Sequence, residues 1–170
     1  MNRKNILTTI FVLAATFAVT ACGFHLRGSA GDANLPFSSI FIALPKNSAL
    51  GIELKRYIRS VDGTKIETDR KKAQVVLESI AESKKKVILT LNSQGRVREY
   101  TLSYLIRFRV VDQKGNILME PTDIEQKRTL AYNEAQALAK EAEEAMLYKD
   151  MQSDLAQQIM RRLIALKMPD

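Results

Sequence analysis

The stretch Arg96–Val111, with the sequence RVREYTLSYLIRFRVV, decides the fold. Successive side chains of a β-strand point to opposite faces of the sheet, so the two parities of this stretch can be compared. One parity is apolar from Tyr100 to Val110, whereas the other is mostly polar. This alternation predicts a long strand in a sheet that buries one face and leaves the other free.

Turn-forming residues flank this strand on both sides. Asn92–Gly95 precedes it and Asp112–Asn116 follows it, and both segments have the composition of hairpin turns. We therefore predict two neighbouring long strands, over Ala73–Leu91 and Ile117–Ala131, that complete an antiparallel meander. Pro121 in the last of them indicates a bulge or a sheet edge, because proline cannot donate to the strand ladder.

A strand and a helix are predicted ahead of the meander. Ser38–Leu44 has the composition of a strand and is followed by Pro45. Apolar residues then recur at helical spacing as far as Val61, after Asn47 or Ser48, either of which can cap a helix.

A long helix is predicted after the meander. From Asn133 onward the chain is rich in helix-forming residues and has neither Gly nor Pro before Pro169. Because only one sheet face is apolar, both helices should cover that face. The predicted class is α+β, a two-layer α/β sandwich with two helices on one face of a four-stranded mixed sheet in the order β-α-β-β-β-α. The predicted apolar stripe of the last helix is Leu138, Ala142, Ala145, Leu155, Ile159 and Leu163.

The N-terminus has the pattern of an export signal. Arg3 and Lys4 are followed by the apolar run Ile6–Val19, which is shorter than the roughly 20 residues of a membrane-spanning helix. The run ends in Val19-Thr20-Ala21-Cys22, which resembles the bacterial lipobox, and this cysteine is the only one in the chain. An ordinary signal peptide followed by a stray cysteine is the alternative.

The lipobox resemblance sets the expected domain boundaries. Residues 1–21 are a lipoprotein signal peptide, 22–36 a lipidated N-terminus and tether, and 37–170 a single sandwich domain. Cys22 would carry an S-linked diacylglycerol and an N-linked acyl chain, and no other cofactor is expected. Gly23, where Asp would favour the inner membrane, implies a lipid-anchored protein on the periplasmic side of the outer membrane.

Composition narrows the function. Lys and Arg number 26 against 19 Asp and Glu, a formal charge of +7, which favours an anionic partner. A single Cys and a single His argue against a metal centre, and no nucleophile motif singles out a catalytic residue, so we expect no enzyme activity. Nucleic acid is not expected as a partner, because the chain has neither a glycine-rich phosphate loop nor an RNA-binding aromatic motif.

A candidate anion site is predicted near the Asn92–Gly95 turn. Arg96 and Arg98 share the apolar parity but precede its hydrophobic run, so both should be exposed at the hairpin tip. Lys84, Lys85 and Lys86 on the partner strand could join them to hold glycolipid phosphates. The alternative is that these lysines only protect a strand edge from aggregation.

Several stretches resemble the LptE family of LPS-assembly lipoproteins. Ala21-Cys22-Gly23-Phe24-His25-Leu26-Arg27-Gly28 is similar to the lipobox junction of that family. Gly95 with Glu99-Tyr100 resembles its central hairpin, Ala137-Leu138-Ala139-Lys140 resembles the start of its last helix, and the element order agrees.

The resemblance implies a function. In this family the lipoprotein plugs the LptD outer-membrane β-barrel, assists its assembly and contacts lipopolysaccharide. Lys140 matches a basic position implicated in lipopolysaccharide binding, with a solvated helix residue as the alternative. A second basic position of the family falls near Ser93, and Arg96 across the turn could supply that charge. His25 would belong to the tether junction. A scaffold or chaperone lipoprotein of another envelope complex, without lipopolysaccharide binding, is the alternative function.

Overall fold

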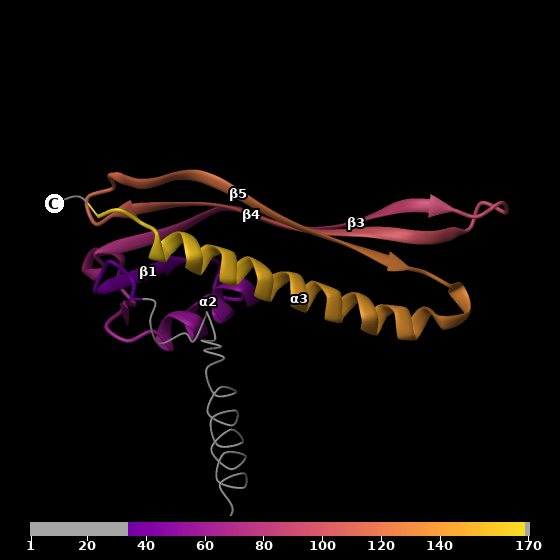
Figure 1. The fold of residues 1–170 in the computed structure, drawn as a ribbon, viewed down its shortest axis with the longest axis horizontal. Coiled ribbons are helices and arrows are strands. Elements are labelled where there is room, and N and C mark those ends of the chain that lie inside the picture. Colours follow the sequence, from indigo (N-terminus) through magenta and orange to yellow (C-terminus); the bar gives the residue numbers. More distant parts are fainter. Residues whose placement is uncertain (1–33, 169–170) are drawn as a thin grey trace, which may run out of the picture. The chain divides into compact units, whose positions relative to one another are not determined.

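The computed structural model describes residues 34–168. Cys22, His25 and the predicted signal peptide lie outside the described residues. A strand and a short helix come first, three long strands follow, and a long helix comes last (Figure 1). The elements in chain order are β1 (Ser39–Ala43), α2 (Ala49–Arg59), β2 (Lys65–Ile66), the 3-10 turn η2 (Arg70–Lys72), β3 (Val75–Leu91), β4 (Val97–Asp112), β5 (Ile117–Ala131), the 3-10 turn η3 (Glu134–Gln136) and α3 (Ala137–Ile164).

The strands form one sheet in the order β2-β1-β3-β4-β5. β1 pairs in parallel with β2 and β3, whereas β3, β4 and β5 form the antiparallel meander (Figure 1). The predicted α+β class and mixed sheet are confirmed, but the sheet has five strands instead of four. The additional strand is β2, which pairs Lys65 with Ser39 and Ile66 with Ile40. A two-residue strand has no periodic pattern, so the sequence does not predict it.

The Ser48 helix cap and Pro121 lie where the sequence patterns predict them. Ser48, one of the two predicted caps, begins α2, and its hydroxyl accepts a hydrogen bond from the Gly51 N–H at 3.1 Å. Pro121 lies on the edge strand β5, where the pairing shifts register next to the Phe108–Thr122 pair. Both outcomes agree with the sequence patterns.

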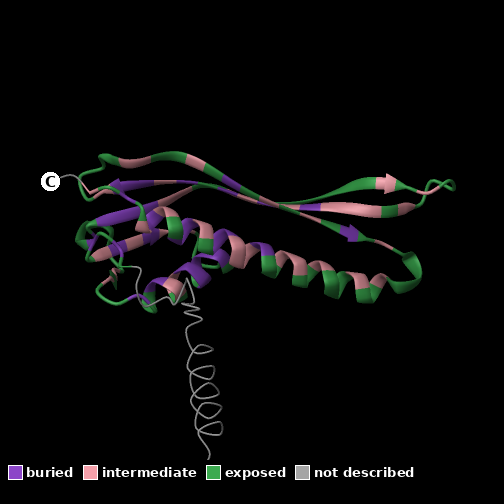
Figure 2. Cartoon of the chain, viewed as in Figure 1, coloured by how far each residue is buried: buried purple, intermediate pink, exposed green. Residues whose placement is uncertain are grey.

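β4 supplies the centre of the core. The side chains of its apolar parity from Leu102 to Val110 have no solvent exposure, whereas Ser103 and Leu105 between them are partly exposed. Both helices lie on the same side of the sheet (Figure 1), and the buried segments of β4 and α3 face each other there (Figure 2). The two-layer arrangement is therefore confirmed. Neither α2 nor α3 covers the opposite face, where a small cluster of Ala73, Val76 and Val111 is buried beside η2.

The two halves of α3 differ in burial. Leu155, Ile159 and Leu163 are fully buried, as predicted. Leu138, however, is 82% exposed, and Ala142 and Ala145 are exposed as well, so the predicted stripe is wrong for the N-terminal half.

The geometry of the helix explains this error. Continuing the buried face backward in steps of three or four residues leads through Met151 and Tyr148 to Glu144 and Lys140. These residues are buried or partly buried, in contrast to the exposed Leu138 (Figure 2). The inward face of the N-terminal half of α3 is therefore polar and aromatic, and its apolar residues face solvent.

An ion-pair network fastens the start of the meander. The Glu78 carboxylate accepts from Arg109 at 2.6 Å and from Arg70 at 2.5 Å. Burial alone would raise the pKa of Glu78, but the hydrogen bonds and positive charges of the two arginines outweigh it and lower this pKa below its ordinary value. The network joins η2 to β3 and β4.

Within the described part of the chain, no helix combines the length and apolarity that crossing a membrane requires.

The unequal halves of α3 predict unequal mutational costs. Leu155→Ala should lower the free energy of unfolding by about 2–5 kcal/mol, because it leaves a cavity between α3 and the sheet. Leu138→Ala, the matched change on the exposed side, should cost less than about 0.5 kcal/mol. Urea unfolding followed by circular dichroism measures both. Equal costs at the two positions would contradict the observed difference in burial between Leu155 and Leu138.

Candidate functional site

The turn between β3 and β4 positions the candidate arginines. Gly95 has a φ of +76°, which an L side chain rarely adopts, and the Asn92 side chain closes the turn. Its Oδ1 atom accepts from the N–H groups of Gln94 and Arg96, each at 2.9 Å. The backbone of Arg96 is thereby fixed at the base of the turn, while its side chain is left free to reach outward.

A cavity of about 610 Å3 lies beside this turn. It forms where β5 leaves β4, just beyond the last backbone hydrogen bond from Tyr132 N–H to the Arg98 carbonyl at 2.7 Å. Arg96, Arg98, Tyr132 and Glu134 contribute to its lining. The cavity therefore combines a polar end of the hairpin with the connection into α3.

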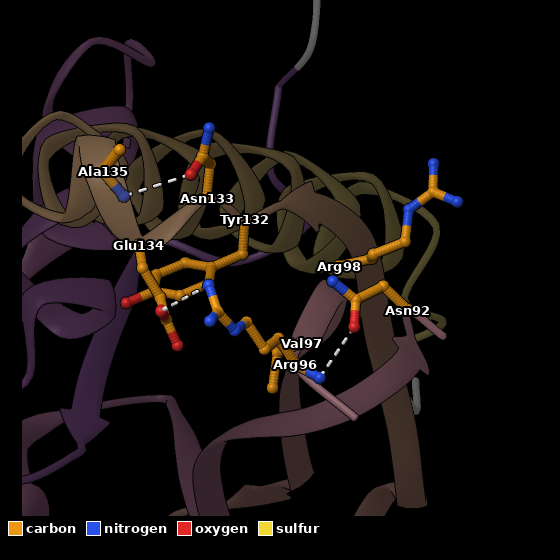
Figure 3. Close-up of a pocket in the computed structure, with 8 residues that line it drawn as sticks. All are labelled: Asn92, Arg96, Val97, Arg98, Tyr132, Asn133, Glu134 and Ala135. Atoms are coloured by element: carbon orange, nitrogen blue, oxygen red, sulfur yellow. Dashed lines mark hydrogen bonds and ion pairs between the residues drawn. The ribbon is translucent and has the colours of Figure 1, made fainter. Parts of the chain in front are cut away.

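The two arginines do not point to one place. Figure 3 shows the Arg96 side chain directed toward Tyr132 and Glu134, with the Arg98 guanidinium pointing away from them. Both residues are exposed, as expected, and Arg96 approaches a carboxylate only at 3.9 Å, in Glu134. At such an exposed site this pair contributes little stability, so Arg96 is available to an anion.

Lys84 and Lys86 face the helix layer. They pair across the ladder with Tyr104 and Leu102, which belong to the buried parity of β4. The Lys84 ammonium lies 4.6 Å from the centroid of the Tyr104 ring and 5.3 Å from that of Tyr148. Such cation–π contacts are worth about 0.5–1 kcal/mol at exposed sites.

Lys86 is engaged most extensively. Its ammonium lies 4.4 Å from the Tyr100 ring centroid and 5.9 Å from that of Tyr132, and it donates to Glu144 of α3 at 2.6 Å. The hydrogen bond to Glu144 raises the pKa of Lys86, against the opposing effect of burial. Tyr132 also lines the cavity beside Arg96. Lys86 is therefore the lysine of the triplet that contacts a residue of that cavity.

Lys85 lies on the opposite side of the sheet. It pairs across the ladder with Ser103, whose parity faces away from the helices. Only its backbone takes part in the helix layer, since its carbonyl accepts from the Tyr148 hydroxyl at 2.9 Å. The lysine triplet is therefore divided between the two faces.

Lys140 lies in the first turns of α3, six residues after the Arg96 partner Glu134. Its side chain is 18% exposed and its ammonium donates to Glu143 at 2.7 Å. It belongs to the inward-facing stripe of the helix, together with Glu144 and Tyr148. An anion that binds Lys140 must therefore compete with a carboxylate next to it.

The sequence patterns do not reveal a second polar network, which joins the strands to α2. The Tyr104 hydroxyl donates to Glu82 at 2.5 Å, and Ser48 donates to the other oxygen of the same carboxylate at 2.9 Å. Burial, and then the hydrogen bond to Glu82, raise the pKa of Tyr104. Its partners are far apart in the sequence, so no spacing indicates them. In residues 34–168 no group of three His, Cys, Asp or Glu side chains is arranged to hold a metal ion.

Comparisons with known proteins agree with this architecture. The family described as "LptE: Lipopolysaccharide-assembly" matches residues 37–163. The LPS-assembly lipoprotein LptE of Pectobacterium atrosepticum is 26% identical over 164 residues, 94% of this chain and 86% of that protein. The protein of the same name from Photorhabdus laumondii is 26% identical over 165 residues, 95% of this chain and 87% of that protein.

Solved structures show the same fold. Lipoprotein B from Nitrosomonas europaea superimposes with a TM-score of 0.71 at 38% identity, covering 84% of this chain and 91% of that one. Rare lipoprotein B from Shewanella oneidensis gives a TM-score of 0.63 at 26% identity, covering 75% and 94%. With a family match that extends from before β1 nearly to the end of α3, this chain belongs to the LptE family of lipopolysaccharide-assembly lipoproteins.

Proposed function

We propose that this protein is an outer-membrane lipoprotein that plugs an LptD-type β-barrel, helps to assemble it and assists lipopolysaccharide delivery to the outer leaflet. The family match over residues 37–163 is the observation that carries the proposal. The family description names assembly rather than a catalytic activity, in line with the expectation that the chain is not an enzyme. A lipid on Cys22 would anchor it on the periplasmic side of the membrane.

The uncovered sheet face supports the plug role. It carries short hydroxylated side chains such as Thr101 and Ser103, together with the Arg107–Asp123 ion pair at 3.3 Å. Val87 and Leu105 lie on the same face, so its polar and apolar side chains are mixed. Its hydroxyl and charged groups can pair with the polar interior of a barrel. The helices occupy the other face, so the sheet face is free for a partner.

The hairpin end supports lipopolysaccharide contact. Lipid A presents phosphates over acyl chains, and Arg96 lines a cavity that also contains the Tyr132 ring. Arg98, Lys85 and Lys140 add positive charge from other directions. The ammonium groups of Lys84 and Lys86 lie against tyrosine rings. The proposed site is therefore a spread cationic surface around the hairpin rather than one preformed phosphate cradle.

A scaffold or chaperone subunit of another envelope complex remains the second candidate. It is favoured by the engagement of Lys86 and Lys140 with Glu144 and Glu143, and by the divergence of Arg96 and Arg98 (Figure 3). In that case the cations of the hairpin end would be structural and would bind no glycolipid. The first experiment that follows tests the lipid anchor that both candidates share, and the second and third separate the two candidates.

The first experiment tests the anchor. Cys22→Ser should abolish acylation and leave uncleaved precursor, because the thiol is the expected lipid acceptor. Mass spectrometry of the protein purified from membranes measures both changes. An unmodified Cys22 in the parent protein would end the lipoprotein proposal.

The second experiment tests the partner. A tagged parent chain extracted in mild detergent should bring down one large β-barrel protein in roughly equal amount. Denaturing gels with mass-spectrometric identification measure this ratio. Recovery as a free monomer, or with an inner-membrane transporter, would favour the second candidate.

The third experiment tests the cationic surface. Arg96→Glu with Arg98→Glu should weaken lipopolysaccharide binding about tenfold or more at moderate salt. Exposed contacts are worth up to about 1 kcal/mol each, and the new carboxylates add repulsion. Lys140→Glu separately tests the basic position that the family resemblance links to lipopolysaccharide binding. The charge-matched control is Lys149→Glu with Lys167→Glu, both exposed on or after α3.

Folding and barrel association should be unchanged in all these variants. Titration with labelled lipopolysaccharide measures binding, and thermal unfolding checks the fold. If the Arg96/Arg98 variant binds as well as the parent, these arginines do not carry recognition, which then falls to Lys140 or to the barrel.

A further inference from the structure

A second cationic groove lies at the other end of the sheet. It encloses about 660 Å3 between α2 and the ends of β1 and β2. β1 pairs with Val75–Glu78, which is the opposite end of β3 from the Asn92–Gly95 turn. Since a strand rises about 3.3 Å per residue, the length of β3 separates this groove from the hairpin surface by tens of ångströms. The two sites are therefore distinct.

Positive charge dominates the lining of this groove. Lys46, Lys55, Arg59 and Lys65 contribute to it, and Glu67 is the acidic side chain among its lining residues. Glu67 pairs with Lys65 at 2.9 Å. Within the described residues, no carboxylate lies within 4.0 Å of the charged nitrogens of the other three cations.

Cations from several elements of the fold converge on the groove. Lys55 and Arg59 are four residues apart on α2, so both project from the same side of that helix. Lys46 approaches from the loop before α2 and Lys65 from β2. Three separate elements thus direct cations at one space, an arrangement that a single solvated helix face would not produce.

The groove also has an apolar part. Leu44 and Ile66 line it and are each only partly buried, so apolar surface is available at the cavity or its mouth. Uncovered apolar surface next to unpaired cations suits a ligand that has an anionic head and a hydrocarbon portion. Free phosphate or a nucleic acid would leave this apolar part exposed.

We propose that this groove binds the headgroup and glycerol region of an anionic glycerophospholipid. The inference rests on the proposed lipid anchor for the source of the ligand. Fifteen residues separate Cys22 from Ser38 and span at most about 55 Å when extended, so a lipid on Cys22 would hold Ser38 within that distance of a bilayer surface. The phosphate lies among Lys55, Arg59 and Lys46, and the upper chains contact Leu44 and Ile66.

The test measures lipid retention. The full chain purified from membranes in dodecyl maltoside is mixed with equimolar phosphatidylglycerol and phosphatidylcholine and examined by native mass spectrometry. We expect one retained phosphatidylglycerol per chain, at least about tenfold more abundant than the phosphatidylcholine adduct. Lys55→Gln with Arg59→Gln should reduce this adduct at least about tenfold, because each charge-assisted contact to phosphate is among the stronger hydrogen bonds. Lys46→Gln alone should give a smaller reduction.

Two controls make the result specific. Lys127→Gln with Lys149→Gln removes the same charge from surfaces outside the groove and should leave the adduct unchanged. Millimolar inorganic phosphate should fail to displace the lipid. Equal retention of the two lipids, displacement by phosphate, or an undiminished adduct in both the Lys55/Arg59 and Lys46 variants would overturn the proposal. None of these outcomes depends on lipopolysaccharide binding at Arg96, so the two proposals fail separately.

Discussion

The apolar face of β4 is the constraint on which the rest of the structure depends. A sheet with one apolar face must bury it, and Leu102–Val110 runs along the middle of the meander. Both helices are therefore placed on one side, with α3 laid along the strands (Figure 1). The other sheet face is covered by neither α2 nor α3, and apart from a small buried cluster of Ala73, Val76 and Val111 it is open to a partner.

The apolar core does not extend to the hairpin end of the sheet. Charged and aromatic side chains take its place there and form part of the cationic surface. Beyond Tyr104 the helix-facing positions of β3 are Lys84 and Lys86, and those of α3 are Tyr148 and Glu144. Tyrosine faces and one carboxylate hold the ammonium groups, so charge and aromatic surface lie in a single layer. An apolar core at this position would have fixed the helix but would have removed the charges of Lys84 and Lys86 from the cationic surface.

Sequence patterns predicted the meander, the buried parity of β4 and the exposure of Arg96 and Arg98, because long strands repeat their two-residue period many times. They missed β2, which is too short to show a period, and placed Leu138 on the wrong side of α3. The two-residue alternation of side chains within β3 is enough to place Lys85 on the opposite sheet face from Lys84 and Lys86. The divergence of Arg96 from Arg98 was not predicted, because strand parity puts both on one face whereas Arg96 lies in the turn before β4 begins at Val97. The Glu82–Tyr104–Ser48 network likewise joins residues that no local pattern relates.

The buried end of α3 also determines when this domain can fold. Synthesis proceeds from the N-terminus, and Leu155, Ile159 and Leu163 are made after every strand of the sheet. Until they emerge, only the short helix α2 is available to cover the apolar face of the sheet, so the core is incomplete. The sequence predicts an exported chain, and translocation requires an unfolded polypeptide. Late completion of the core therefore leaves time for the predicted export of the chain before the domain folds.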